Sequence, residues 1–179
     1  DHPFQTLADL MTIREEFGNN LRGKKIAVSW AYAPSYAKPM SVPQGLITLM
    51  PRFGLDVVLA QPPEYNLMKS ELEYARKAAK ENGTKFEVVD NMDEAFEGAD
   101  IVYPKSWGIE SLFHDPKEAL EISKKYKHWI CDEKKMKLTK KDAIYMHCLP
   151  ADRGYEVTDS VIDGRRSRVF LEAENRLHT

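Results

Sequence analysis

Short strand-forming runs alternate with helix-forming segments along most of this chain, and this alternation limits its possible folds more than any other feature. Strands are expected at 25–30, 56–60, 85–89, 100–103, 143–146 and 168–171, and helices at 46–53, 70–82, 92–97 and 115–126. Such an order predicts a parallel sheet with helices on both faces. We therefore expect a single three-layer α/β domain over residues 1–179, of the Rossmann-like kind.

Glycine and proline residues mark several of the expected helix boundaries. Gly54 and Gly83 follow the segments 46–53 and 70–82, as glycines that end helices commonly do. Asp115 is a favourable N-cap, with Pro116 at the first helical position. Pro51 argues against a continuous helix over 46–53, because a proline inside a helix removes a backbone donor.

Composition excludes several classes of function. The chain has 26 Lys and Arg against 28 Asp and Glu, so it lacks the basic excess expected of a nucleic-acid surface. Its apolar runs are much shorter than the roughly 20 residues needed to span a membrane, and no signal-peptide pattern is present. Two cysteines do not make a disulfide framework, which favours a reducing cytoplasm.

Motifs for a metal or a nucleotide cofactor are missing from the sequence. The five histidines show no metal-ligand spacing, and no Cys-x-x-Cys motif occurs. No Gly-rich phosphate loop follows any expected strand, so nucleotide binding finds no motif to support it. We expect neither a metal nor a cofactor.

Three blocks with chemically distinctive side chains directly follow expected strands: 30–34, 105–108 and 147–150. Parallel strands place such blocks at one edge of the sheet, where this architecture binds ligands. Each block alone has an ordinary explanation, because Cys148 could be a small buried hydrophobe and Lys105 a solvated charge. The segment 30–44 holds three prolines and is longer than usual strand-to-helix loops, so it is either a surface excursion or a rigid loop that shapes a site.

The blocks 147–151, 153–154, 156–159 and 172–178 read HCLPA, RG, EVTD and EAENRLH. They resemble ornithine carbamoyltransferases, and the resemblance covers essentially the whole chain. The segments 38–44 (KPMSVPQ) and 103–108 (YPKSWG) instead resemble the knotted subgroup of that family, the N-acetylornithine and N-succinylornithine carbamoyltransferases. In that subgroup a proline-rich loop threads a knot, and 30–44 is the expected counterpart.

The resemblance implies roles for individual residues in transferring a carbamoyl group from carbamoyl phosphate to a small amino-acid acceptor. His2 and Gln5 would contact the carbamoyl group, with His2 polarising its carbonyl oxygen, and Arg176 would bind the oxygens of carbamoyl phosphate. Cys148 and Leu149 would offer backbone carbonyls to the carbamoyl nitrogen and the incoming amine, so Cys148 is not a nucleophile.

The resemblance also implies a cis bond between Leu149 and Pro150. The residues expected to contact the acceptor are Lys105, Ser106, Trp107 and Pro150.

The chain departs from ornithine enzymes in the block that would hold the acceptor. Those enzymes carry an Asp and a Ser-Met-Gly loop after the strand at 100–103, and the Asp holds the α-amino group of the substrate. Here the stretch reads YPKSWG, which lacks both. Lys105 suits a carboxylate or an acylated nitrogen better than a cationic ammonium, so free ornithine is disfavoured.

A second departure concerns the phosphate site. The Ser-x-Arg-Thr block of the N-terminal domain does not occur in this sequence. We therefore expect a fragment without the carbamoyl-phosphate domain, inactive and monomeric alone, whereas the full-length protein would be a homotrimer.

Three hypotheses follow from the sequence. The first is a carbamoyltransferase whose acceptor is not free ornithine. The second is an ordinary ornithine carbamoyltransferase, and the third is a non-catalytic binding domain that has kept the fold.

Overall fold

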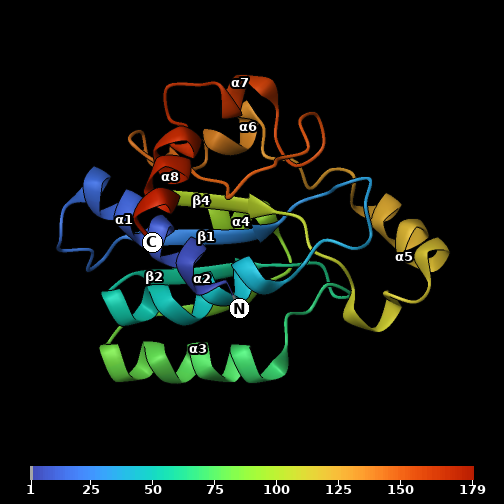
Figure 1. Ribbon diagram of the computed structural model, residues 1–179, viewed down its shortest axis with the longest axis horizontal. Helices are drawn as coiled ribbons and strands as arrows, with labels where there is room; N and C mark the ends of the chain where they lie inside the picture. The colour runs from blue at the N-terminus through green and yellow to red at the C-terminus, as the bar shows by residue number, and fades with distance from the viewer. Residues whose placement is uncertain (1) are drawn as a thin grey trace.

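The computed structural model describes residues 2–179 and contains one five-stranded sheet in the order β3–β2–β1–β4–β5 (Figure 1). All four pairings between neighbouring strands are parallel. The predicted α/β class is therefore confirmed. The strands are β1 (Lys25–Trp30), β2 (Asp56–Ala60), β3 (Phe86–Val89), β4 (Ile101–Lys105) and β5 (Ile144–Tyr145).

Helices and short 3₁₀ turns connect these strands, and no helix among residues 2–179 is long and apolar enough to cross a membrane. The α-helices are α1 (Pro3–Phe17), α2 (Ser41–Leu49), α3 (Lys69–Asn82), α4 (Met92–Phe96), α5 (Pro116–Ser123), α6 (Glu133–Met136), α7 (Asp159–Ile162) and α8 (Val169–Asn175). The 3₁₀ turns are η1 (Met50–Phe53), η2 (Glu110–Leu112), η3 (Lys124–Tyr126) and η4 (Arg176–His178).

The strand order reverses between β1 and β4. From β1 the chain moves through β2 to the edge strand β3, then returns across the sheet to β4 and β5 on the other side of β1. Right-handed crossovers in opposite directions place their helices on opposite faces. Thus α2 and α3 cover one face and α4 the other, and α1 packs beside α2 and α8 (Figure 1).

Burial explains why the central strands form where the sequence predicts them. All but the first residue of β1 and every residue of β4 is buried, as expected of a parallel sheet covered on both faces. Trp30 lies opposite Lys105 in the register of β1 and β4, so both strands end at the same level. This level is the edge where the predicted ligand-binding blocks emerge.

The segment predicted as a strand at 168–171 is instead the start of a helix. Residues 166–168 do run beside β5, since Tyr145 N donates to Arg166 O and Arg168 N donates to Tyr145 O, both at 2.9 Å. The chain then turns into α8, which buries Val169 and exposes Phe170. In this apolar run Val169 is buried and the next residue, Phe170, faces solvent. The prediction of a strand at 168–171 was wrong.

The helical prediction for 46–53 is confirmed, with a change of helix type at its end. Leu49 ends α2, and Pro51 lies in the first turn of η1, where its missing N–H costs little. Gly54 follows with a φ of 95°, the left-handed conformation that glycine adopts readily.

The sequence did not predict α1, which is the longest helix among the described residues. Its buried face carries Gln5, Thr6, Asp9 and Thr12 beside apolar residues. These polar positions interrupt the apolar periodicity by which an amphipathic helix is normally found.

A tight contact joins the loop after β1 to the segment after β4. Gly108 N donates to Lys38 O at 2.9 Å, and a Cβ at position 108 would lie 2.2 Å from Tyr36 O and 2.6 Å from Phe113 Cε1. Only glycine fits without a backbone shift. This contact fixes two walls of the cleft described below.

We predict that Gly108→Ala lowers the free energy of unfolding by about 1–3 kcal/mol, the usual range for an overpacked site. Urea denaturation monitored by circular dichroism measures this change. The exposed Ser35→Ala in the same loop is the control and should stay within about 0.5 kcal/mol of the parent. Equal stability of the two variants would contradict the tight contact.

Candidate active site

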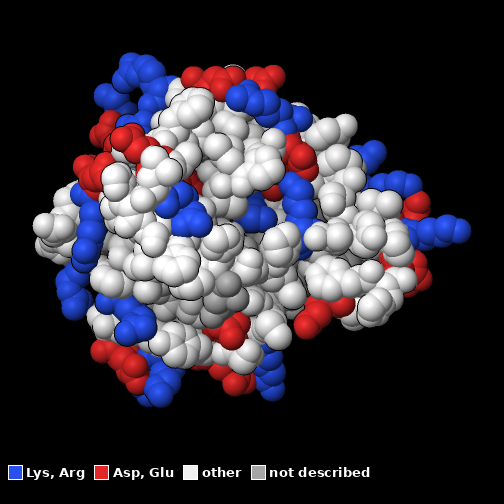
Figure 2. Space-filling model, in the orientation of Figure 1, with Lys and Arg blue, Asp and Glu red and all other residues white. Residues whose placement is uncertain are grey.

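A cleft of about 320 Å³ lies beyond the carboxyl ends of β1, β4 and β5, beside the point where the strand order reverses. Crevices at this position are where open α/β sheets bind ligands. Figure 2 shows Lys and Arg side chains reaching the middle of one molecular face, where the surface is otherwise mostly uncharged. The cleft is lined by His2, Gln5, Lys38, Pro39, Ser41, Val42, Lys105, Cys148, Leu149, Pro150 and Asp152.

The cleft brings together most of the residues predicted from the sequence. Those that line it are His2, Gln5, Lys105, Cys148, Leu149 and Pro150. Ser106, Trp107 and Arg176 do not line it. Trp107 is buried in the core and donates from Nε1 to Tyr65 O at 2.8 Å, while Arg176 donates to Thr179 Oγ1 at 2.8 Å.

Lys105 ends β4 and directs an ammonium group toward the cleft. The residue is 7% exposed, and among residues 2–179 its Nζ donates only to Ser106 O, at 3.0 Å. Burial lowers the pKa of Lys105, although Cys148 and Glu156 partly oppose the shift. No carboxylate of the described chain pairs with this ammonium, so an anionic group of a ligand would find a cation with free donors.

Cys148 is a neutral thiol in this environment. Burial raises its pKa to about 12, and the neighbouring Lys105 offsets only part of this effect. Nucleophilic catalysis by cysteine uses the thiolate, which this raised pKa disfavours. This agrees with the expectation that Cys148 positions a substrate.

The turn after β5, which lines the cleft, has an unusual backbone. The Leu149–Pro150 bond is cis, as predicted, and Leu149 is the only non-glycine among the described residues with a positive φ, at 53°. His147 stabilises this turn, because its Nδ1 accepts a hydrogen bond from Leu149 N at 2.9 Å. The carbonyl oxygens of Cys148 and Leu149 accept no hydrogen bond from any residue in 2–179.

Glu156 is a buried carboxylate that joins three walls of the cleft. Its Oε1 accepts from Ser106 N at 2.6 Å, and its Oε2 accepts from Asp152 N at 2.7 Å and from Lys38 Nζ at 3.0 Å. Oε1 also lies 3.5 Å from His147 Nε2. The loop after β1, the end of β4 and the turn after β5 are therefore tied to one side chain.

The contacts of Glu156 keep it ionised. Burial by itself would raise its pKa, but the His147 ring and the backbone donors of Asp152 and Ser106 outweigh that effect and lower the pKa to about 2. Its partner Lys38 also pairs with Asp152 at 2.7 Å. Burial disfavours the ammonium, yet these two carboxylates raise the pKa of Lys38 overall.

Sequence reasoning assigned no role to Lys38, Asp152 or Glu156. Lys38 and Glu156 both lie in blocks that carry the family resemblance, so a signal existed. Their pairing was not visible because they stand 118 residues apart in the chain.

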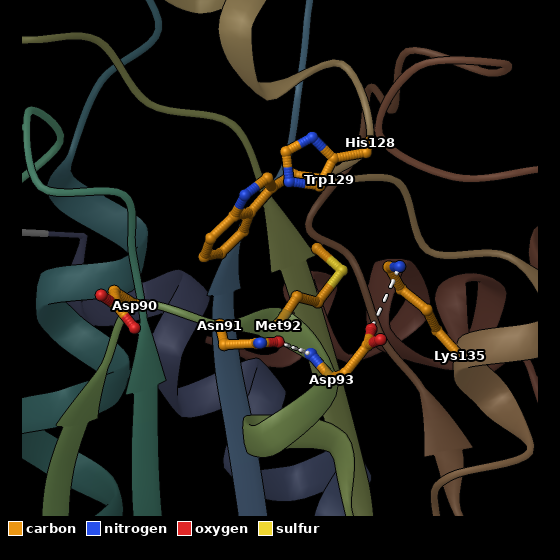
Figure 3. A pocket seen from close by; sticks show the side chains of 7 residues that line it. All are labelled: Asp90, Asn91, Met92, Asp93, His128, Trp129 and Lys135. Carbon is orange, nitrogen blue, oxygen red and sulfur yellow. Dashed lines mark hydrogen bonds and ion pairs between the residues drawn. The ribbon is translucent and has the colours of Figure 1, made fainter.

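A second, smaller pocket of about 160 Å³ lies after β3 and contains none of the predicted site residues (Figure 3). Its polar groups bond to each other: Asp93 N donates to Asn91 Oδ1 at 2.8 Å, and Lys135 pairs with Asp93 at 3.1 Å. These contacts cap α4 and join it to α6. Across residues 2–179 no group of three or more His, Cys, Asp or Glu side chains is arranged to hold a metal ion.

Residues 37–179 match the family model "Aspartate/ornithine carbamoyltransferase, Asp/Orn binding domain". This match covers most of the chain, including nearly the whole cleft. The chain belongs to the aspartate/ornithine carbamoyltransferase family. The predicted family resemblance is thereby confirmed.

Relatives within the family differ in their acceptors. The putative carbamoyltransferase YgeW of Escherichia coli (strain K12) is 45% identical over 97% of this chain and 50% of its own length. The N-acetylornithine carbamoyltransferase of Xylella fastidiosa (strain Temecula1) is 40% identical over 99% of this chain and 53% of its own. An ornithine carbamoyltransferase of Caldicellulosiruptor saccharolyticus is also 40% identical, over 99% of this chain and 54% of its own.

A crystal structure of acetylornithine transcarbamylase complexed with acetylcitrulline superposes on this chain with a TM-score of 0.91. The two are 39% identical, over 99% of this chain and 53% of the other. The chain thus spans about half the length of the curated relatives it matches.

We predict that Glu156→Gln lowers the free energy of unfolding at pH 7 by about 3 kcal/mol, as expected for a carboxyl whose pKa falls from 4.5 to about 2 on folding. Because the folded pKa is depressed, this stabilisation is present above about pH 4.5 and is lost as the pH falls toward 2. Urea unfolding at a series of pH values measures it.

In that experiment the stabilities of the parent and the Glu156→Gln variant should converge progressively as the pH falls from about 4.5 toward 2. The exposed Glu110→Gln is the matched control and should parallel the parent throughout. A constant difference between parent and Glu156→Gln from neutral to acid pH would contradict the ionised state of Glu156.

Proposed function

We propose that the full-length protein transfers the carbamoyl group of carbamoyl phosphate to the side-chain amine of an Nα-acylated ornithine or a similar acceptor. The observation that carries this proposal is Lys105, a buried ammonium with free donors in the cleft. It stands where ornithine enzymes are expected to hold an α-ammonium with an Asp. A cation there repels free ornithine and favours an acceptor that presents a carboxylate and an uncharged α-nitrogen.

The cleft supplies both kinds of polar group that carbamoyl transfer requires. His2 lies at the N-cap of α1, where the orphan N–H groups of a long helix favour an anion or a developing oxyanion. The carbonyl oxygens of Cys148 and Leu149 are free acceptors for the N–H groups of the carbamoyl group and of the attacking amine.

In the proposed reaction the neutral amine of the acceptor attacks the carbonyl carbon of carbamoyl phosphate. A tetrahedral intermediate forms, its C–O bond to phosphate breaks, and the proton lost by the attacking amine passes to the departing phosphate, so the products are a ureido compound and hydrogen phosphate. His2 stabilises the developing oxyanion, and the 148–149 carbonyls align the two nitrogens. Alignment and preorganised electrostatics supply the rate enhancement without a cofactor.

The relatives support this assignment of the acceptor. Among the proteins that this chain resembles are N-acetylornithine carbamoyltransferases, and one matching structure is a complex with acetylcitrulline. The identity with an ornithine carbamoyltransferase makes free ornithine the second candidate. Lys105 favours the first.

We further infer that residues 1–179 form the acceptor-binding domain and that another part of the protein grips the phosphate. The half-length match to the relatives supports this division. On the same basis we infer a cytoplasmic homotrimer in which Arg176 leaves Thr179 to bind carbamoyl phosphate, and in which the proline-rich segment 30–44 forms a knot. Ser106 and Trp107 then act by supporting the wall that holds Lys105.

The proposed function is tested by offering the full-length protein carbamoyl phosphate with N-acetylornithine, N-succinylornithine and ornithine in parallel, with ureido product as the readout. Turnover is expected on an acylated acceptor. Efficient turnover on free ornithine alone would refute the role of Lys105, and no product with any acceptor would refute the proposed reaction.

We predict that Lys105→Met raises the KM for the acylated acceptor roughly ten- to hundredfold, because a hydrogen bond to a charged group contributes about 1.5–3 kcal/mol. The KM for carbamoyl phosphate should change much less. Steady-state kinetics with each substrate varied in turn separates the two constants. The exposed Lys137→Met is the control and should match the parent.

A further inference from the structure

Two buried carboxylates, Asp9 on α1 and Glu172 on α8, lie together behind the cleft. Asp9 is 0% exposed and Glu172 is 1% exposed. Within residues 2–179 neither forms an ion pair with Lys, Arg or His. Two adjacent buried carboxylates without a bonded cation cannot both carry a full charge.

The hydrogen-bond donors around the two carboxylates are neutral and too few. Gln5 Nε2 donates to Asp9 Oδ1 at 2.8 Å and to Glu172 Oε1 at 3.1 Å. The Tyr103 hydroxyl donates to Glu172 Oε1 at 2.9 Å, and His147 N donates to Glu172 Oε2 at 2.9 Å. Asp9 Oδ2 has no partner among the described residues. The pair needs a proton of its own.

The pKa values of the two carboxyl groups also indicate that the pair holds a proton. Burial raises the pKa of Asp9 to about 7, and burial together with the neighbouring Asp9 raises the pKa of Glu172 well above its usual range. The other titratable or charged groups that face the pair include Tyr103 on β4, Tyr145 on β5, Cys148 after β5 and Arg176 on η4. Burial also raises the pKa of Tyr103 and of Cys148, so neither group ionises in place of the pair.

The pair fixes the orientation of the Gln5 side chain. Turning this amide over would set its oxygen against two acidic groups, so Nε2 must face Asp9 and Glu172. Gln5 lines the cleft, and its Oε1 accepts no hydrogen bond from any residue in 2–179. Gln5 therefore provides a hydrogen-bond acceptor, its Oε1, to the cleft and not a donor.

We propose that Asp9 and Glu172 share one proton and act as a positioning pair, which holds the Gln5 amide so that its oxygen accepts a hydrogen bond from an N–H of the bound substrate. This inference rests on the proposed function for the identity of that N–H, the carbamoyl nitrogen. The same pair supports the turn after β5, because Glu172 also accepts from His147 N. Neither carboxylate needs to touch the substrate.

The test compares the full-length parent, Asp9→Asn/Glu172→Gln and Gln5→Ala by the KM for carbamoyl phosphate. Removing both acids frees the Gln5 amide to turn over, so the double variant should raise this KM about tenfold, the value of one lost hydrogen bond. In the Gln5→Ala background the same double substitution should cause no further rise. The exposed Glu174→Gln on α8 is the control and should leave the KM unchanged.

A purely structural role would give a different pattern. It predicts that the double substitution raises the KM equally with and without Gln5, and that outcome would overturn the positioning role. An unchanged KM in a correctly folded double variant would also overturn it.

The shared proton is tested separately by infrared spectroscopy of the full-length protein at neutral pH. The parent should show the carbonyl band of a protonated carboxylic acid, and this band should shift in either single variant, Asp9→Asn or Glu172→Gln, because each removes the partner carboxylate. Absence of the band in the parent would refute the shared proton. This measurement needs no turnover, so it stands even if the double variant fails to fold or the proposed reaction is wrong.

Discussion

The cleft depends on a single buried carboxylate that remains charged. Glu156 accepts hydrogen bonds from the Ser106 and Asp152 backbones and from the Lys38 ammonium, and it lies beside the His147 ring. A buried charge is tolerated only when it is surrounded by donors, and here those donors come from three segments that follow the neighbouring strands β1, β4 and β5. Their need to satisfy one anion gives the cleft a defined shape without any bound ligand.

Asp9 and Glu172 also contact the turn after β5, through the hydrogen bond from His147 N to Glu172. They avoid the cost of a buried charge in a different way from Glu156. Their surroundings offer a phenol, an amide and one backbone N–H but no bonded cation. Neutralisation by a proton is then cheaper than ionisation. The turn 147–150 therefore contacts an ionised carboxylate, Glu156, and an acid pair, Asp9 and Glu172. Glu156 is held ionised by the His147 ring and by two backbone N–H donors, whereas the acid pair has one backbone N–H and no bonded cation.

The sequence predicted those parts of the fold that depend on local composition. The three central strands, β1, β2 and β4, were found because most of their residues are apolar and buried. Helix α1 was missed because its buried face carries the polar residues Asp9 and Gln5. The start of α8 was predicted as a strand because Val169 and Phe170 are adjacent residues of high strand propensity. In the cleft, the sequence placed Lys105 and the 148–150 turn correctly at the sheet edge. It could not place Glu156, whose partners lie 50 and 118 residues away.

The two ends of the chain are bonded into one unit. Gln5 on α1 donates to Glu172 on α8, Asn175 donates to Thr12 at 3.0 Å, and Glu172 in turn accepts from the backbone of the cleft. Any hinge motion that brings another domain against these helices must carry His2, Gln5 and the 148–149 carbonyls along together. Closure would then change the access of water to the cleft while the spacing of its polar groups stayed fixed.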